Sequence, residues 1–395
     1  MKIRSGTAEF KRAQLAMLAV GLAIFNSLYS TQALLPTLTS ELGIPPVTSA
    51  LTVSAATGAL ALFVIPFSIL SEKYGRGRII LISALAASAV GLCLPLCQTA
   101  GQLIALRAVQ GALIAGTPAV AMAWLSEELD ESDLPGAMGL YIAGTSIGGL
   151  TGRLIPAAVL EFASWRWALL ATSAFALALS LAVAVLLPQQ RNFTPKDSIR
   201  PGSEIHAVVR HLRNPRLIAL YAAAFVSMGV FVSLYNYFGY RAIEHFGLPP
   251  ALAGLVFVMY LSGTFSSARA GVYVTRFGRG PVVVAAAALM LLGVLVAISP
   301  ALWLALAGML LFTASFFALH STASGWVGRI ADRDRAEASS LYVFCYYMGS
   351  SVLGAATGAA FGSLPWAGFI AVLAGLLALL VGIAAALAAA ERRRS

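Results

Sequence analysis

Runs of about twenty apolar residues recur along the whole 395-residue chain, and each is long enough to cross the hydrocarbon core of a bilayer. Hydrophobic residues make up 59% of the chain and charged residues only 11%, a balance that a soluble domain of this size could not bury. The sequence therefore predicts an all-α membrane protein with twelve transmembrane helices. These are expected near 13–38, 48–70, 79–97, 102–125, 136–160 and 165–187, and near 216–240, 250–274, 281–299, 301–327, 337–361 and 366–389.

The positions of the lysines and arginines predict the topology. Twelve crossings place both termini on one side of the membrane, and 21 of the 26 Lys and Arg residues lie in cytoplasmic segments if that side is the cytoplasm. Arg166 and Arg241 fall in outer loops, whereas Arg107, Arg153 and Arg269 lie inside spans. We therefore expect a multi-pass protein of the cell (inner) membrane with both termini cytoplasmic. The net charge of +10 sits in short clusters between spans, which argues against a nucleic-acid partner.

The two sets of six spans resemble each other in sequence. Phe25-Asn-Ser-Leu-Tyr29 recurs 206 residues later as Phe231-Val-Ser-Leu-Tyr235, and Tyr74-Gly-Arg-Gly77 recurs 203 residues later as Phe277-Gly-Arg-Gly280. A duplicated six-span unit is typical of transporters whose halves rock around a site near the membrane midplane. We expect an N-terminal six-helix bundle, a cytoplasmic linker and a C-terminal six-helix bundle at 1–187, 188–215 and 216–395.

A basic loop between the second and third spans reads Leu70-Ser-Glu-Lys-Tyr-Gly-Arg-Gly-Arg78. It resembles the Gly-x-Leu-Ala-Asp-Arg-x-Gly-Arg signature of the major facilitator superfamily, with Ser68 for the glycine and Glu72 for the aspartate. The resemblance covers essentially the whole chain and is nearest to the drug:proton antiporter branch and its YnfM-type inner-membrane transporters. It implies the major facilitator fold of two pseudo-symmetric bundles, and a gating motif of Glu72, Lys73, Gly75, Arg76 and Arg78. Positive-inside topology alone would also account for the arginines.

The fourth span contains Arg107-Ala-Val-Gln-Gly111, which is similar to the family's Arg-x-x-Gln-Gly motif. The resemblance implies that Arg107 and Gln110 take part in proton coupling. A spacing of three residues places both side chains on one helical face, from which they can point into a polar cavity. The alternative is that Arg107, near the outer end of its span, extends to the lipid headgroups.

The fifth span contains Gly139-Leu-Tyr-Ile-Ala-Gly-Thr-Ser-Ile-Gly-Gly-Leu-Thr-Gly-Arg153. This segment resembles the antiporter motif of the family, with Gly149 in place of its central proline and Arg153 in place of its terminal glycine. Glycines at helical spacing let two helix backbones approach closely. We therefore interpret the segment as a helix-packing motif of Gly144, Gly148, Gly149, Gly152 and Arg153.

The titratable groups expected inside the membrane are few. None of the 16 Asp and Glu residues lies deep within a span, which predicts a preference for neutral or anionic amphiphiles over quaternary cations. His320 lies in the tenth span, and an imidazole titrates in the range that suits proton exchange. A neutral histidine hydrogen-bonded to a neighbouring helix is an equally good interpretation of this residue.

Polar residues of the first and seventh spans are expected to line a substrate cavity, because polar side chains are disfavoured against lipid. Asn26, Tyr29 and Gln32 correspond by the internal repeat to Tyr235 and Asn236. Further stacking surfaces are expected from Tyr141 and Tyr346 in the fifth and eleventh spans. For any single tyrosine, a position in the interfacial aromatic belt is the alternative.

These observations predict a secondary active transporter that exports a small neutral or anionic amphiphile, a drug or metabolite, by proton-coupled alternating access. An importer or uniporter on the same fold is one alternative, and a membrane sensor or receptor is the alternative from another class. We expect no enzymatic activity, cofactor or metal ion, because the spans lack a metal-ligand cluster, a Ser-His-Asp arrangement and a phosphate-binding loop. The expected partners are a small-molecule substrate, protons and the lipid bilayer, and the chain is expected to be a monomer.

Overall fold

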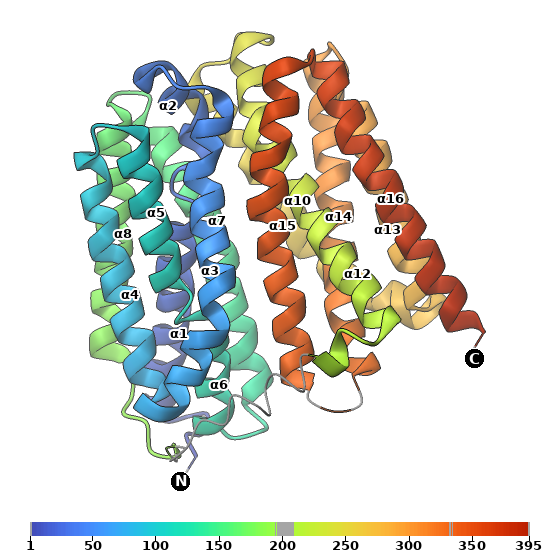
Figure 1. Cartoon of the computed structure of the whole chain (residues 1–395). Helices are drawn as coiled ribbons and strands as arrows, with labels where there is room; N and C mark the ends of the chain where they lie inside the picture. The colour runs from blue at the N-terminus through green and yellow to red at the C-terminus, as the bar shows by residue number, and fades with distance from the viewer. Residues whose placement is uncertain (1, 194, 196–208, 332, 334, 394–395) are drawn as a thin grey trace. The chain divides into compact units, whose positions relative to one another are not determined.

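The computed structural model describes residues 2–193, 195, 209–331, 333 and 335–393. In these residues the chain forms twelve long helical segments, which confirms the predicted all-α architecture (Figure 1). Segments in lipid must pair their backbone groups internally, and a helix does so within each apolar run. The first six segments are α1 (Ala8–Leu28) with η1 (Gln32–Leu34) and α2 (Leu35–Leu42), α3 (Pro46–Tyr74), α4 (Arg76–Cys93) with η2 (Leu94–Leu96), α5 (Ala100–Ile114) with α6 (Pro118–Glu128), α7 (Leu134–Val159) and α8 (Trp165–Leu186).

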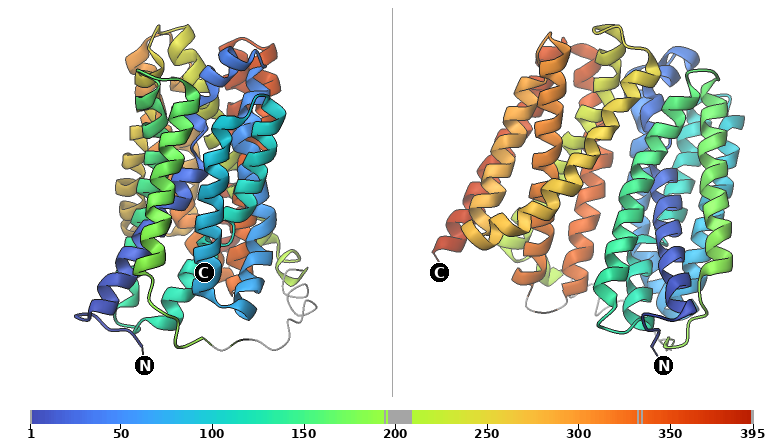
Figure 2. Two further views of the ribbon diagram at one scale, coloured as in Figure 1. Left: turned by 90° about the vertical axis from the view of Figure 1, so that its left-hand side faces the viewer. Right: turned by 180° about the vertical axis from the view of Figure 1, so that it is seen from behind.

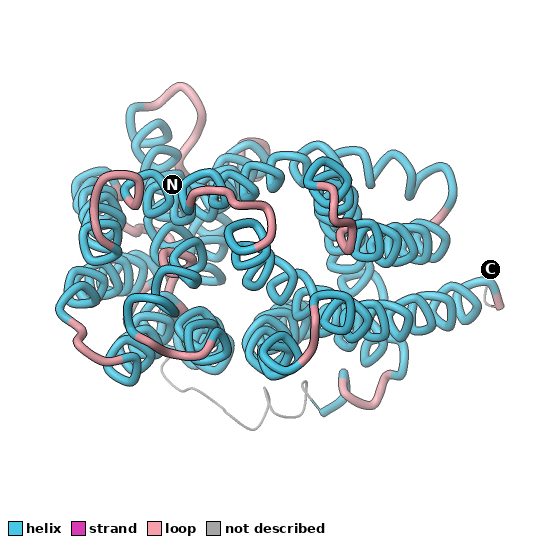
Figure 3. The backbone as a smooth tube through the Cα atoms, turned by 90° about the horizontal axis from the view of Figure 1, so that it is seen from above, coloured by secondary structure: helices cyan, strands magenta, loops and turns pink. Residues whose placement is uncertain are grey.

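The second six segments follow the same order. They are α10 (Pro215–Glu244), α11 (Pro250–Gly254) with η3 (Leu255–Met259) and α12 (Tyr260–Phe277), α13 (Arg279–Val296), α14 (Leu302–Ile330), α15 (Arg335–Ser363) and α16 (Trp366–Arg392). Seen from above, the described chain consists of helices joined by short loops (Figure 3). Gly75 and Gly278 hold matching places between the second and third segments of each set, and both adopt positive φ, +98° and +84°. The duplicated Gly-Arg-Gly sequence thus forms a similar turn twice, because glycine tolerates this backbone conformation.

Ten of the twelve segments are long and apolar enough to cross a membrane by length and composition alone. The two others, α7 and α15, contain many Gly, Ser, Thr and Tyr residues, which lower their hydropathy. These two helices pack along α1 and α10 respectively. Small and polar residues permit close helix packing but lower the mean hydropathy, and for this reason α7 and α15 are not recognised as spans by hydropathy alone.

The chain divides into two compact units. Unit 1 comprises 1–44, 51–199 and 249–255, and unit 2 comprises 45–50, 200–248 and 256–395. Within unit 1, α1 lies against both α7 and α8 (Figure 2), and within unit 2, α13 lies against α14 and α16. The expected bundle boundaries at 187 and 216 remain a prediction, and residues 194 and 196–208 of the expected linker lie outside the described residues.

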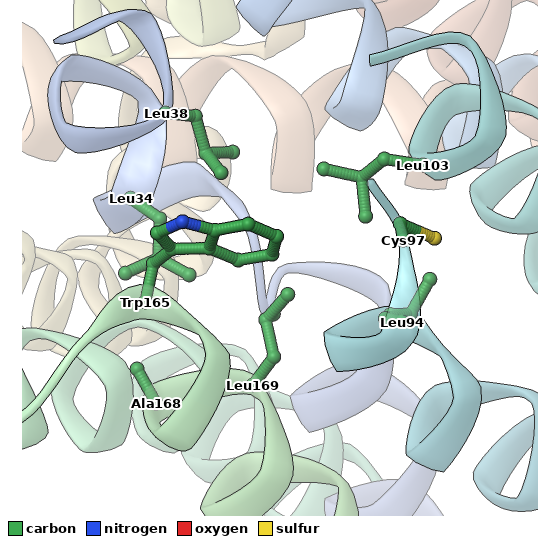
Figure 4. Close-up of a cluster of buried hydrophobic side chains, with 8 residues drawn as sticks. All are labelled: Leu34, Leu38, Leu94, Cys97, Leu103, Trp165, Ala168 and Leu169. Atoms are coloured by element: carbon green, nitrogen blue, oxygen red, sulfur yellow. The ribbon is translucent and has the colours of Figure 1, made fainter. Parts of the chain in front are cut away.

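One end of unit 1 is closed by a buried apolar cluster (Figure 4). Trp165 begins α8 and is 1% exposed, and it packs among leucines from η1, α2, η2 and α5. The cluster ties the helix ends together on the side that the predicted topology places outside. Its members are Leu34, Leu38, Leu94, Cys97, Leu103, Trp165, Ala168 and Leu169.

Candidate functional site

Arg107 lies at the centre of a hydrogen-bond network inside unit 1. Its side chain is fully buried; Nε donates to the Thr52 carbonyl at 2.9 Å and Nη1 donates to the Ser27 carbonyl at 2.8 Å. The guanidinium also donates to the carbonyl of Leu28 and to the Gln110 side chain. A buried guanidinium is tolerated in a membrane when its donors are paired. The side chain therefore does not extend to the lipid headgroups, and it joins α1, α3 and α5 through backbone oxygen atoms.

Gln110 and Gly111 complete this junction. The Gln110 amide donates to the Ala87 carbonyl at 3.0 Å, which adds α4 to the network. A Cβ on Gly111 would collide with the backbone of Ala56 in α3. The Arg-x-x-Gln-Gly spacing thus supplies a charge, an amide that accepts from it, and a close contact between α5 and α3.

Three of the five residues in the predicted helix-packing motif contact α1 directly. A Cβ on Gly144 would lie 2.6 Å from the Leu18 carbonyl oxygen, and one on Gly148 would lie 2.5 Å from that of Leu22. One turn later, a Cβ on Gly152 would collide with the carbonyl oxygen of Asn26, also in α1. These glycines recur every four residues and so form one smooth face of α7.

Gly149 and Arg153 take a different place from the one expected for them. Arg153 is 2% exposed, and its Nε donates to Gln32 Oε1 at 2.7 Å while the guanidinium carbon lies 3.8 Å from the Tyr29 ring centroid. The guanidinium also donates to the Gly149 carbonyl. Both residues therefore join Tyr29 and Gln32 in a buried polar cluster, because the glycine leaves room for the guanidinium and the aromatic face attracts it.

Substituting a packing glycine should separate α1 from α7. We expect Gly148→Ala to destabilise the folded protein by about 1–3 kcal/mol, because the added methyl must displace the α1 backbone. Gly139→Ala on the same helix is the matched control, since a Cβ there meets nothing within 4 Å. Denaturant unfolding of the purified variants in detergent measures the difference, and equal stability of the two would contradict the packing role of Gly148.

The two other expected cavity residues of unit 1 are held by neighbouring helices. Asn26 is fully buried; its amide donates to the Thr172 carbonyl at 2.9 Å and its oxygen accepts from Thr151 at 3.2 Å. Tyr141 is 3% exposed and donates to the Pro118 carbonyl at 3.4 Å. Both side chains face the protein interior, and neither of the expected cavity tyrosines of unit 1, Tyr29 and Tyr141, is exposed.

In unit 2 the expected cavity residues lie in an aromatic environment. The hydroxyl of Tyr235 lies 2.6 Å from that of Thr313 in α14, and its ring centroid is 4.9 Å from that of Tyr260. Asn236, the next residue of α10, is 1% exposed. Tyr235 and Asn236 are thus buried within their own unit.

His320 is half-buried in α14 and faces aromatic residues of α15. Its Nδ1 lies 3.1 Å from the Tyr342 hydroxyl, and its ring centroid is 4.6 Å from that of Tyr346. Phe316, one turn earlier, stacks on the imidazole at 6.0 Å between centroids. This is the hydrogen bond to a neighbouring helix that a neutral histidine would make, and the partner hydroxyl can also relay a proton.

At the other end of unit 1, the predicted gating motif surrounds Arg76. The Arg76 guanidinium lies 3.1 Å from Glu127 and 3.6 Å from Glu72, and it donates to the Ser71 hydroxyl at 2.6 Å. Gly75 provides the turn that begins α4. The two other motif residues, Lys73 and Arg78, are exposed. The structure thus gathers Glu72, Gly75 and Arg76 around one ion-pair network and leaves Lys73 and Arg78 at the surface.

Two acidic residues of unit 1 have partners that the sequence did not reveal. Glu127 accepts from the Gln190 amide at 3.0 Å as well as pairing with Arg76. Glu128 is fully buried and accepts from the backbone amide of Arg191 at 3.0 Å and from the Asn192 side chain at 3.1 Å. Two adjacent carboxylates at the end of a span indicate that basic or polar partners lie nearby. The sequence does not identify those partners, because they lie in the irregular connection that follows α8.

Comparisons with known proteins agree with this architecture. The sequence profile of the Major Facilitator Superfamily matches residues 16–266. The Inner membrane transport protein YnfM of Escherichia coli K12 is 42% identical over 96% of this chain and 92% of its own length. An uncharacterized MFS-type transporter, YybF, of Bacillus subtilis 168 is 36% identical over 95% and 93%. The crystal structure of a bacterial homolog of the human lysosomal transporter Spinster, inward-facing and occupied, matches with a TM-score of 0.78, 15% identity and 98% coverage of both chains.

Proposed function

This chain belongs to the Major Facilitator Superfamily, and on that premise we propose that it exports small neutral or anionic amphiphiles in exchange for protons. It is a multi-pass inner-membrane transport protein with the major facilitator fold. In the proposal, six-helix bundles at 1–187 and 216–395 alternate around a central site, and both termini and the linker at 188–215 are cytoplasmic. The transporter acts as a monomer on a small-molecule substrate.

The observation that carries the substrate class is the sign of the charges buried within the helices. Arg107 is fully buried, and its described partners are carbonyl, hydroxyl and amide oxygens of neutral groups. Each described carboxylate lies in the first or last turn of a helix or in a connection. A binding site formed by such helices offers positive charge and neutral dipoles, which disfavour a permanently cationic substrate.

Export is supported by the glycine segment of α7 that resembles the family's antiporter motif. Gly144, Gly148 and Gly152 pack on the α1 backbone as such a motif requires. In the proposal, proton exchange rests on Arg107, Gln110 and His320, of which His320 carries an imidazole, a side chain that can bind and release a proton.

Reconstitution in liposomes with an imposed pH gradient tests this proposal. We expect the gradient to drive a neutral and an anionic fluorescent amphiphile at least about tenfold faster than a quaternary cation of similar size, a modest difference in binding free energy. Empty liposomes and a gradient collapsed by an ionophore are the controls. Strong transport of the cation alone would contradict the substrate class. Flux that ignores the pH gradient indicates a uniporter, flux along with protons indicates an importer, and no flux of any compound indicates a sensor or receptor.

A further inference from the structure

A cavity of about 370 Å³ opens at the end of unit 2 where α10 and α13 begin and α14 and α16 end. The proposed topology places this end at the cytoplasmic surface. Three of its lining side chains are arginines from three different helices, and one is a carboxylate. The lining residues used in this argument are Asn214, Arg216, Arg279, Trp326, Arg329 and Glu391.

The cavity carries an excess of positive charge. Arg279 lies close enough to Arg329 for the two guanidinium groups to repel each other, and Glu391 opposes only part of this repulsion. The Nε of Arg216 is buried and has no described hydrogen-bond partner. Among the described residues, none of the three guanidinium groups forms an ion pair with a carboxylate. A buried donor without a partner is unfavourable, so the cavity is suited to an anion that supplies acceptors.

The matching end of unit 1 shows that this charge excess is specific to unit 2. There, Arg76 of the first Gly-Arg-Gly sequence pairs with Glu127 in the last turn of α6. In unit 2, Arg279 of the second Gly-Arg-Gly sequence lines the same cavity as Arg329 in the last turn of α14. At these corresponding places, unit 1 has a carboxylate and unit 2 has a guanidinium group.

The rest of the frame is retained in both units. The backbone amide of Gly77 donates to Gln190 at 3.2 Å in unit 1, and that of Gly280 donates to Glu391 at 3.2 Å in unit 2. In unit 1 the arginine pairs with Glu127 and the turn is bound by the neutral side chain of Gln190, whereas in unit 2 the turn is bound by Glu391, so that three arginines share one carboxylate at the cavity. Positive-inside topology accounts for arginines at this level of the membrane, but not for three of them converging on one cavity.

We propose that this cavity binds a phosphate group, carried either by the headgroup of an anionic phospholipid or by a free phosphate compound. Guanidinium groups bind phosphate oxygens with two parallel hydrogen bonds, and three of them can surround one phosphate. The N-termini of α10 and α13 add the positive ends of two helix dipoles. Trp326 supplies an apolar wall, and the volume is sufficient for a headgroup. Binding at this cavity can be measured without transport, so the test does not depend on the proposed function.

The test uses the delipidated full-length protein in detergent. Native mass spectrometry with dioleoyl-phosphatidylglycerol measures lipid binding, with dioleoyl-phosphatidylcholine as the zwitterionic reference, and thermal unfolding in inorganic phosphate against chloride of equal ionic strength measures free phosphate. We expect Arg279→Gln/Arg329→Gln to weaken binding of phosphatidylglycerol by roughly thirtyfold, from the contribution of two arginines near a membrane surface. Arg276→Gln removes an exposed charge at the same end of unit 2 that does not line the cavity, and it should change affinity less than about twofold.

The outcomes separate the sources of the phosphate. Saturable binding of phosphatidylglycerol without protection by inorganic phosphate assigns the cavity to a lipid headgroup, and protection by inorganic phosphate that the double variant loses assigns it to a free phosphate compound. Wild-type affinity of the double variant for both probes would overturn the proposal. If that variant does not fold, Arg216→Gln takes its place, with an expected loss of roughly fivefold. Unchanged affinity of this variant would likewise overturn the proposal.

Discussion

Arg107→Met is expected to reduce transport by at least about a hundredfold, because the charge and every hydrogen bond of the guanidinium disappear together. The carbonyls of Ser27, Leu28 and Thr52 would then lose donors inside the membrane. Methionine is chosen because it occupies the corresponding turn of α14, at Met309, where it is fully buried. It therefore fills similar space in a helix of this type without restoring the donors.

Two further variants show whether the loss depends on the guanidinium. Arg107→Lys keeps the charge but cannot reach α1 and α3 at once, so we expect a loss of at least about tenfold. Arg166→Met removes an exposed arginine that makes one described hydrogen bond, to the Cys97 carbonyl, and should transport within about twofold of wild type. Flux is measured in liposomes and divided by the amount of monodisperse protein. Full transport by Arg107→Met would show that the network has no role in the transport cycle.

His320→Ala is expected to abolish substrate movement driven by a pH gradient while the protein still inserts and folds. The imidazole faces the hydroxyl of Tyr342 and the rings of Tyr346 and Phe316, so the described contacts around it are aromatic. An imidazole ordinarily titrates near pH 6.5 and can therefore take up and release a proton between the two sides of the membrane. Alanine removes that group without adding a side chain that could bind a proton.

The decisive measurement compares two modes of transport in the same liposomes. Gradient-driven uptake should be lost in His320→Ala, whereas exchange of substrate across the membrane without a gradient should persist. Loss of both modes would indicate that His320 only holds α14 to α15, a role that Tyr342→Phe tests by removing the same hydrogen bond. His245→Ala, at the end of α10, is the matched control and should retain both modes. Gradient-driven uptake at the wild-type rate would refute proton coupling through His320.

The elements and their order could be predicted from sequence because each apolar run is long and is separated from the next by charged residues. The duplicated Gly-Arg-Gly turn could also be predicted, because the same three residues recur in both halves and the first glycine adopts positive φ in each. The face that each residue presents was harder to predict. Gly148 and Gly149 are neighbours in the motif, yet the first contacts α1 and the second accommodates Arg153.

This difference has a physical origin. A helix that is apolar all round has no amphipathic stripe, so its sequence does not identify its neighbours. The partners of Glu127 and Glu128 could not be predicted either, because Gln190 and Asn192 lie in an irregular connection. Only the folded chain shows that these acids bind the segment that follows α8. It also shows that Arg107 donates to the backbone carbonyls of α1 and α3.

The contact between α1 and α7 limits how this protein can change shape. Leu18, Leu22 and Asn26 of α1 face Gly144, Gly148 and Gly152 of α7, one turn apart on each helix, with backbone against backbone. Sliding either helix along the other would drive the side chains between the glycines into the opposing main chain. We therefore expect α1 and α7 to move as one rigid pair, so that any bending within unit 1 during a transport cycle occurs in its other helices.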